Sequence, residues 1–363
     1  MLSRRVISRS ALGLGIGALA VSSPAARVSL AQAHPTVSII WSRPTDSIIP
    51  LTSIFDAAPL PDGNVVLLDN ANQRAYIVDR SGSQIAQFGG LGGGPGELQN
   101  VRDLGIDLDG SILLADGGTR RIQRWDAKGK YLGIVDATPL WHFLASGPGG
   151  VYLRTRPPLI PPGDGKGPLQ AQMWLRNLDT LSIERSGRFR LEWTEDQSNQ
   201  TPGEFCWYCP AVPMSMDTLV VGYWGPGVEL GLQDREGRVL RKIELSPYSA
   251  VSYSASEIAS ATRTWVRRTG RLGTVPDYLS HPKPGLTTNA VGVDARHRIW
   301  IRPTTSEAEG TRLIAFDATG RIVFDSHLPY PASQLRVNGN WIALLGERTS
   351  DDAPVVTLLE IRQ

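Results

Sequence analysis

Three side chains that could bind a metal ion or a polar ligand recur at one position of a repeated pattern. Asp56, Asp103 and His142 each lie seven residues before a turn glycine. Two carboxylates and an imidazole that converge could hold a divalent cation or a polar ligand. No cofactor is otherwise predicted, so the hypothesis to test is a divalent metal held by these three residues.

The same offset reaches weaker candidates further along the chain. It falls at Pro210 in the fourth copy and at Ala290, next to Asn289, in the fifth. With Arg102, which precedes Asp103, Asn289 completes the set of candidate ligand-binding residues. Because one station holds alanine, polar residues that hydrate a channel are the favoured interpretation, and a metal site is the alternative.

These residues belong to an internal repeat. Residues 62–69 correspond to 109–116, and residues 74–79 correspond to 121–126, both at a displacement of 47 residues. Each copy consists of short apolar segments separated by Asp-Gly, Ser-Gly or Lys-Gly pairs, which predicts β-strands joined by tight turns. Six copies are found, each marked by an acidic residue at the end of a strand: Asp79, Asp126, Asp179, Asp234, Asp317 and Glu360.

The clearest copies resemble NHL repeats. The resemblance rests on Phe88-Gly89-Gly90 with Gly96-Glu97-Leu98, on Asp107 and Asp109-Gly110, and on Arg121-Ile122 followed by Trp125-Asp126. It is good over residues 54–135, moderate over 286–326 and thin elsewhere. It implies an all-β, six-bladed β-propeller of four-stranded blades. Propellers of this type often act as recognition or scaffolding modules, whereas related families use the tunnel mouth for metal-assisted lactone hydrolysis or lyase chemistry.

The last copy lacks its outer strand, because the chain stops at Gln363, three residues after Glu360. The β-rich segment 36–41 has no blade of its own, and we expect it to pair beside residues 356–361 and close the ring. The domain prediction is a signal peptide at 1–33 and a propeller at 34–363. The blades are expected at about 54–89, 101–136, 140–191, 209–246, 286–328 and 331–363, the last completed by 36–41.

The largest insertion, residues 247–285, separates blades four and five. Ser254-Ala255-Ser256-Glu257 has the pattern of a capping box, and Gly270 is a suitable end, which together predict one helix. Ile258, Ala261 and Trp265 fall near one face of that helix. The helix could cover the mouth of the central tunnel or buttress a blade edge.

Residues 1–33 resemble a twin-arginine export signal. Arg4-Arg5 precede an apolar run over residues 11–21, and Ala31-Gln32-Ala33 suits cleavage before His34. No other segment is long and apolar enough to span a membrane, so we expect a periplasmic or secreted protein with no membrane span after cleavage.

The only two cysteines are Cys206 and Cys209. In an exported protein a disulfide between them is the default prediction, with redox activity a distant second.

Composition excludes one class of partner. Of 37 basic residues, four lie in residues 1–33, which hold no acidic residue, so the remainder has 33 basic and 35 acidic residues and a formal charge of −2. A near-neutral body gives no reason to expect nucleic acid as a partner.

The sequence favours an exported propeller that binds a protein, peptide or small ligand, and leans away from an enzyme. The alternatives are a lactonase-like hydrolase or lyase at the tunnel mouth, and an accessory subunit of an envelope complex docked through residues 247–285.

Overall fold

The computed structural model describes residues 34–49, 54–136, 142–155, 170–175, 188–192, 210–223, 225–234, 238–269, 277–306, 309–346 and 353–362. The predicted signal peptide and the Cys206–Cys209 pair lie outside these ranges. None of the helices within them is long and apolar enough to cross a membrane.

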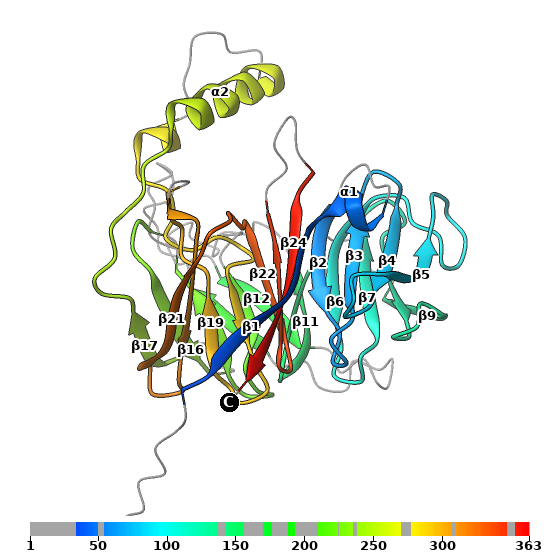
Figure 1. Cartoon of the computed structure of the whole chain (residues 1–363), viewed down its shortest axis with the longest axis horizontal. Helices are drawn as coiled ribbons and strands as arrows, with labels where there is room; N and C mark the ends of the chain where they lie inside the picture. Colours follow the sequence, from blue (N-terminus) through cyan, green and yellow to red (C-terminus); the bar gives the residue numbers. More distant parts are fainter. Residues whose placement is uncertain are drawn as a thin grey trace, which may run out of the picture. The chain divides into compact units, whose positions relative to one another are not determined.

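The described strands form six sheets of four antiparallel strands (Figure 1). The first sheet contains β2 (Ile54–Pro59), β3 (Val65–Asp69), β4 (Arg74–Val78) and β5 (Gln84–Gly89). The second contains β6 (Val101–Ile106), β7 (Ile112–Asp116), β8 (Arg121–Trp125) and β9 (Tyr131–Asp136). The third contains β10 (His142–Gly147), β11 (Gly150–Thr155), β12 (Gln170–Leu175) and β13 (Arg188–Glu192).

The fourth sheet contains β14 (Ala211–Pro213), β15 (Leu219–Gly222), β16 (Glu229–Gln233) and β17 (Val239–Glu244). The fifth contains β18 (Val291–Val293), β19 (Ile299–Ile301), β20 (Thr311–Phe316) and β21 (Ile322–Leu328). The sixth is built from β22 (Gln334–Asn338), β23 (Trp341–Leu345) and β24 (Val355–Arg362), with β1 (Thr36–Pro44) outside β24.

The repeated Asp-Gly pairs form the turns that the sequence predicts. Gly63 and Gly110 occupy the same position in consecutive repeats, with φ of +85° and +82°. Glycine adopts this left-handed conformation without the steric penalty that a Cβ atom would bring. Each turn therefore sends the chain back so that the apolar segments on its two sides pair as strands.

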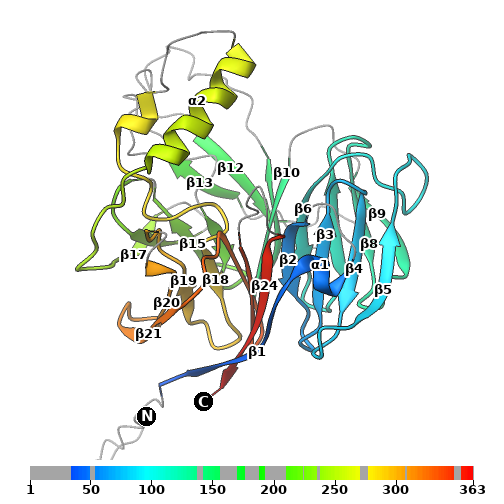
Figure 2. The ribbon, with the colours of Figure 1, turned by 45° about the horizontal axis from the view of Figure 1, so that its top comes forward.

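The strand at the start of the described chain pairs with the strand at its end. In the register of β1 and β24, Thr36 lies opposite Arg362 and Pro44 lies opposite Val355 (Figures 1 and 2). The Ser42 and Thr357 hydroxyl oxygens are 2.7 Å apart across this pair. The predicted pairing of segment 36–41 with the last strand is therefore present, and it supplies the fourth strand of the sixth sheet.

Neighbouring sheets share apolar clusters. Phe88, from the first sheet, lies with its ring centroid 5.2 Å from that of Trp125 in the second, and both residues are buried. The first strand of each sheet contacts the first strand of the next in chain order, from β2 through β6, β10, β14 and β18 to β22, and β22 also contacts β2. These contacts, with four strands in each sheet and few helices, define an all-β propeller with four-stranded blades.

The insertion after β17 holds helix α2 (Ala255–Thr269) and the short 3-10 helix η2 (Asp277–Ser280). Another short helix, α1 (Thr45–Ile48), follows β1. In Figure 2, α2 lies beyond one end of the strands. The contacts described below tie α2 to other parts of its own insertion. The two expected roles of the helix, a cover on the tunnel mouth and a buttress on a blade edge, stay predictions.

Candidate functional site

Two of the predicted site residues meet around an arginine. Nη2 of Arg336, on β22, lies 2.5 Å from Oδ2 of Asp56 on β2 and 3.0 Å from Oδ1 of Asp103 on β6. Nε of Arg336 also donates to Oδ1 of Asp56 at 3.2 Å. The Asp56 carboxylate is therefore held by two parallel hydrogen bonds, the strong geometry for an arginine–carboxylate pair.

The backbone places the two carboxylates in equivalent positions. Both β2 and β6 contain a bulge, between Ile54 and Asp56 and between Val101 and Asp103. In each strand the aspartate Oδ1 accepts a hydrogen bond from the next backbone N–H, at 2.9 Å from Ala57 and 2.8 Å from Leu104. The common offset from the turn glycine thus identified residues that share a local conformation.

This cluster is almost closed to solvent. The side chain of Arg336 is 16% exposed, that of Asp56 1% and that of Asp103 9%. Burial alone would lower the pKa of Arg336, but the charges and hydrogen bonds of the two carboxylates outweigh it and raise the pKa, so the guanidinium stays protonated. The three side chains form an ionic link between the first strands of three sheets.

The guanidinium occupies the position that a metal would need. A divalent cation there would compete with Arg336 for the same oxygen atoms and would meet its positive charge. Among the described residues, no three histidine, cysteine or acidic side chains come together as a possible metal site. The backbone puts Arg102 on β6 and His142 at the start of β10, but their side chains are outside the description. The carboxylates do not fit the predicted metal.

Asn289 lies at the seam between two sheets. Its carbonyl oxygen accepts the N–H of Leu335 at 2.6 Å, and its amide donates to Gln334 at 3.5 Å. Gln334 in turn donates to the carbonyl of Phe55 at 2.8 Å. Asn289 therefore links the segment just before β18 to β22 in this structure.

Sequence reasoning missed Arg336 because it lies three residues before the turn glycine Gly339, whereas the aspartates lie seven residues before theirs. A usable signal was present, since Arg336 is the one charged residue of the strand Gln334–Asn338. The first strands of the six sheets, which contact one another in turn, are the inner strands. An arginine on one inner strand and aspartates on two others carry opposite charges, and a closed ring of sheets can bring such charges together.

The second candidate is a pocket beside α2. The helix begins as the sequence predicts: the N–H of Ser254 donates to Oε2 of Glu257 at 2.8 Å, and the N–H of Glu257 donates to Oγ of Ser254 at 3.3 Å. This reciprocal capping box fixes the start of the helix and therefore which of its faces carries Glu257.

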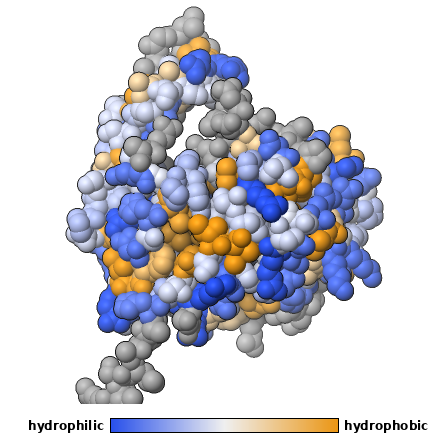
Figure 3. All heavy atoms as spheres, viewed as in Figure 1, coloured by the Kyte–Doolittle hydropathy of each residue, from blue (hydrophilic) through white to orange (hydrophobic). Residues whose placement is uncertain are grey.

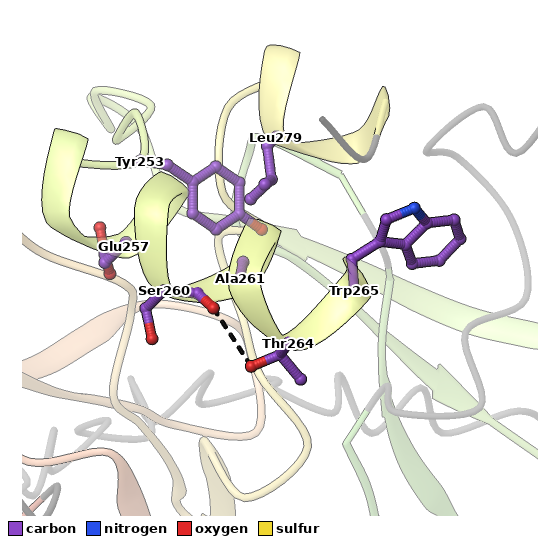
Figure 4. Close-up of a pocket in the computed structure, with 7 residues that line it drawn as sticks. All are labelled: Tyr253, Glu257, Ser260, Ala261, Thr264, Trp265 and Leu279. Atoms are coloured by element: carbon purple, nitrogen blue, oxygen red, sulfur yellow. Dashed lines mark hydrogen bonds between the residues drawn. The ribbon is translucent and has the colours of Figure 1, made fainter. Parts of the chain in front are cut away.

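That face lines a pocket of about 370 Å³ (Figure 4). Such a volume lies within the range of about 300–1,000 Å³ that is usual for small-molecule sites. Its lining residues come from the segment before α2, from one face of α2 and from η2; they are Tyr253, Glu257, Ser260, Ala261, Thr264, Trp265 and Leu279. In Figure 4, the rings of Tyr253 and Trp265 lie on either side of Ala261, and Leu279 lies above the helix.

The charged groups at one end of the pocket neutralise one another. Nζ of Lys283 lies 2.6 Å from Oε1 of Glu257 and 5.7 Å from the centroid of the Tyr253 ring. Burial raises the pKa of Glu257, but hydrogen bonds from Lys283 and Ser254 outweigh it and hold the pKa below its usual value. Glu257 is therefore ionised at neutral pH and paired with Lys283.

No family of known proteins matches the sequence, and the comparison with curated proteins gives no match. Solved structures are similar in fold. A protein from Bacteroides fragilis, provisionally named as exported, is 12% identical with a TM-score of 0.52, over 91% of this chain and 96% of that chain.

Two further similar structures have lower scores. A gluconolactonase from Xanthomonas campestris is 14% identical with a TM-score of 0.41, over 90% of each chain. An aldose sugar dehydrogenase from Streptomyces coelicolor, in its PQQ-bound form, is 16% identical with a TM-score of 0.40, over 91% of this chain and 99% of that chain. At these identities the similarity concerns the propeller fold alone.

Proposed function

We propose that this protein is an exported propeller that binds a protein, peptide or small ligand, and that the pocket beside α2 is its recognition site. The observation that carries the proposal is the pocket itself, which combines apolar and aromatic walls with a few polar groups. Small-molecule and peptide sites have this composition. The recognition element is thus the insertion between β17 and β18, and the inner strands support it.

The propeller in this proposal has six blades, closed by β1. Support comes from the six four-stranded sheets, from the contact of β22 with β2 and from the pairing of β1 with β24. Further support comes from Gly63, where an added Cβ atom would lie 2.5 Å from the ring of Trp341. The turn after β2 therefore packs directly on the sheet that contains β1.

The export part of the proposal rests on the sequence of residues 1–33, which resembles a twin-arginine signal cleaved before His34. It places the protein in the periplasm or outside the cell. In such a compartment Cys206 and Cys209 would form a disulfide. The fold similarity to a protein provisionally named as exported agrees with this location.

The rival function, a lactonase-like hydrolase or lyase at the inner strands, is less well supported. Its proposed carboxylates, Asp56 and Asp103, are both bound to Arg336 and almost completely buried. A carboxylate that is held in this way is poorly placed to bind a metal or to accept a proton from water.

The test compares a variant whose new side chain fills the pocket with a matched control variant. Ala261→Trp places a large side chain among the lining residues, whereas Ala259→Trp makes the same change at an exposed position of the same helix. A library of small molecules and short peptides is screened against the wild-type protein by ligand-observed NMR and thermal shift. We expect binders that Ala261→Trp abolishes and Ala259→Trp leaves unchanged.

Two results would overturn the proposal. One is a set of binders that the Ala261→Trp variant, shown by circular dichroism to be folded, retains with unchanged affinity. The other is turnover of lactone or ester substrates by the purified protein that is lost in Asp103→Asn, since that would locate the function at the inner strands.

A further inference from the structure

We propose that the α2 pocket binds a pyranose ring of a neutral saccharide. This inference rests on the proposed function and names the chemical class of its ligand. It depends on three properties of the described part of the pocket: the placement of its two aromatic rings, its hydroxyl groups and the pairing of its acidic residue with a lysine.

The aromatic rings suit a flat ligand that has an apolar face. Tyr253 and Trp265 are half-buried, and Leu279, at 6% exposure, closes the pocket between them. The π face of an aromatic ring carries negative partial charge. The C–H groups on one face of a pyranose carry positive partial charge and form an apolar surface, so they stack favourably on such a ring.

Small residues leave room between the rings. Ser260, Ala261 and Thr264 lie on the face of α2 that lines the pocket, since residues three and four apart share a helix face. A leucine or phenylalanine in their place would fill the space. Ala261 lies between the two rings, where a flat ring could rest on its methyl group (Figure 4).

Hydroxyl groups line the edge of the pocket. The Thr264 hydroxyl donates to the carbonyl of Ser260 at 3.1 Å, which leaves the lone pairs of its oxygen able to accept a hydrogen bond. The exposed Ser260 side chain supplies a second hydroxyl that can both donate and accept. Each hydroxyl of a sugar needs such a partner when it leaves water.

The charge of the pocket favours a neutral ligand. Among the lining residues that the structure describes, the one acidic residue is Glu257, which is paired with Lys283 at 2.6 Å. A charged ligand would have to disturb this pair or enter without a partner of its own. The space-filling view shows pale, strongly hydrophilic and hydrophobic residues side by side over the α2 insertion (Figure 3).

The experiment titrates the wild-type protein with neutral disaccharides of glucose, galactose and N-acetylglucosamine, using saturation-transfer NMR. Tyr253→Ala and Trp265→Ala are each expected to weaken binding of the best disaccharide by about tenfold, the upper end of what one aromatic contact contributes. Tyr253→Phe keeps the ring and should retain most of the affinity. Glucosamine and glucuronic acid disaccharides should bind no more tightly than the neutral ones.

Each outcome separates this inference from the proposed function. If neutral aromatic compounds or peptides bind at a site that Ala261→Trp blocks, while no saccharide binds, the ligand class is wrong and the proposed function stands. If saccharides bind with the same affinity to Ala261→Trp and to wild type, the site is wrong. If no ligand of any class depends on Ala261, both proposals fall.

Discussion

Nη2 of Arg336 lies 3.0 Å from Oδ1 of Asp103, although the sheet of β2–β5 stands between their two sheets in the order of contacts. The arginine reaches past its neighbour Asp56, to which it is also bound, and joins β22 to β6. One side chain from the sixth sheet thus ties together the first and second. The stability of this part of the propeller should depend on it more than on any exposed ion pair.

The first prediction concerns Arg336→Met. Removing the guanidinium takes from the two buried carboxylates the positive charge that binds both of them, and breaking a buried ion pair in this way typically costs about 3–5 kcal/mol of unfolding free energy. The matched control is Arg312→Met, since Arg312 is paired with Asp325 at 2.6 Å but both side chains are partly exposed, at 24% and 34%. That variant should lose about 0–1 kcal/mol. Urea denaturation measures both, and equal losses would show that the buried cluster has no special role.

A second prediction tests the packing between the first and sixth sheets. Gly63→Ala and Gly110→Ala place alanine in the same left-handed conformation, at an intrinsic cost of about 1–2 kcal/mol each. The Cβ atom at Gly110 would meet Pro61 at an ordinary 3.5 Å, whereas that at Gly63 would meet Trp341 at 2.5 Å. Gly63→Ala should therefore cost about 1–3 kcal/mol more. Similar melting temperatures for the two variants would count against a direct contact between these sheets.

Another prediction concerns β1. Trp41 is 6% exposed and packs in an apolar cluster with Trp341 and Leu358, so Trp41→Ala should destabilise the fold by about 3–5 kcal/mol. Ile39, on the same strand, is 51% exposed, and Ile39→Ala should change stability by less than about 0.5 kcal/mol. Thermal unfolding of both variants checks this. If Trp41→Ala unfolds like wild type, β1 contributes little to the stability of the sixth sheet.

The last prediction is that the stability of the fold depends on pH through Tyr248. Burial, with a smaller contribution from the charge of Glu309, raises the pKa of Tyr248 from 10.0 to about 12, against an opposing effect of Arg302. Its hydroxyl donates to the carbonyl of Thr304 at 2.8 Å. The unfolded chain would release this proton near pH 10 and the folded protein near pH 12. The contribution of Tyr248 to the free energy of unfolding is therefore complete below about pH 10 and is lost as the pH rises through 12.

Tyr248→Phe removes this titrating group, so the free energy of unfolding of the variant should fall less steeply than that of the wild type between about pH 10 and pH 12. The absorbance of tyrosinate in the folded protein, compared between wild type and Tyr248→Phe, gives the pKa directly. A difference spectrum that titrates near pH 10 would contradict the burial argument.

The repeat made much of the propeller predictable. Tight turns and paired strands follow from local sequence, so Gly63 and Gly110 could be aligned and Asp56 and Asp103 assigned to equivalent positions. The pairing of β1 with β24 was predictable for another reason, since an incomplete last unit and an unassigned first strand require each other. The capping box of α2 was predictable because Ser254 and Glu257 are three residues apart.

Arg336 and the α2 pocket were not predicted, because both depend on which segments meet after folding. Arg336 is separated from Asp103 by 233 residues of chain, and no local pattern connects them. Tyr253 and Leu279 lie on opposite sides of α2 in the sequence, and only the folded protein shows that Leu279, on η2, lines the same pocket as Ala261. The sequence placed Asp56 and Asp103 at equivalent positions of the repeat, but it did not predict that both would bind Arg336.

The pairing of Thr36 with Arg362 has a consequence for biosynthesis. Among the described strands, β1 is synthesised before all the others and its partner β24 after all the others, so until β24 is made the apolar residues of β1 have no partner strand. A translational pause before β24 is made would prolong that exposure, so the nascent chain should be most prone to aggregate just before β24 leaves the ribosome.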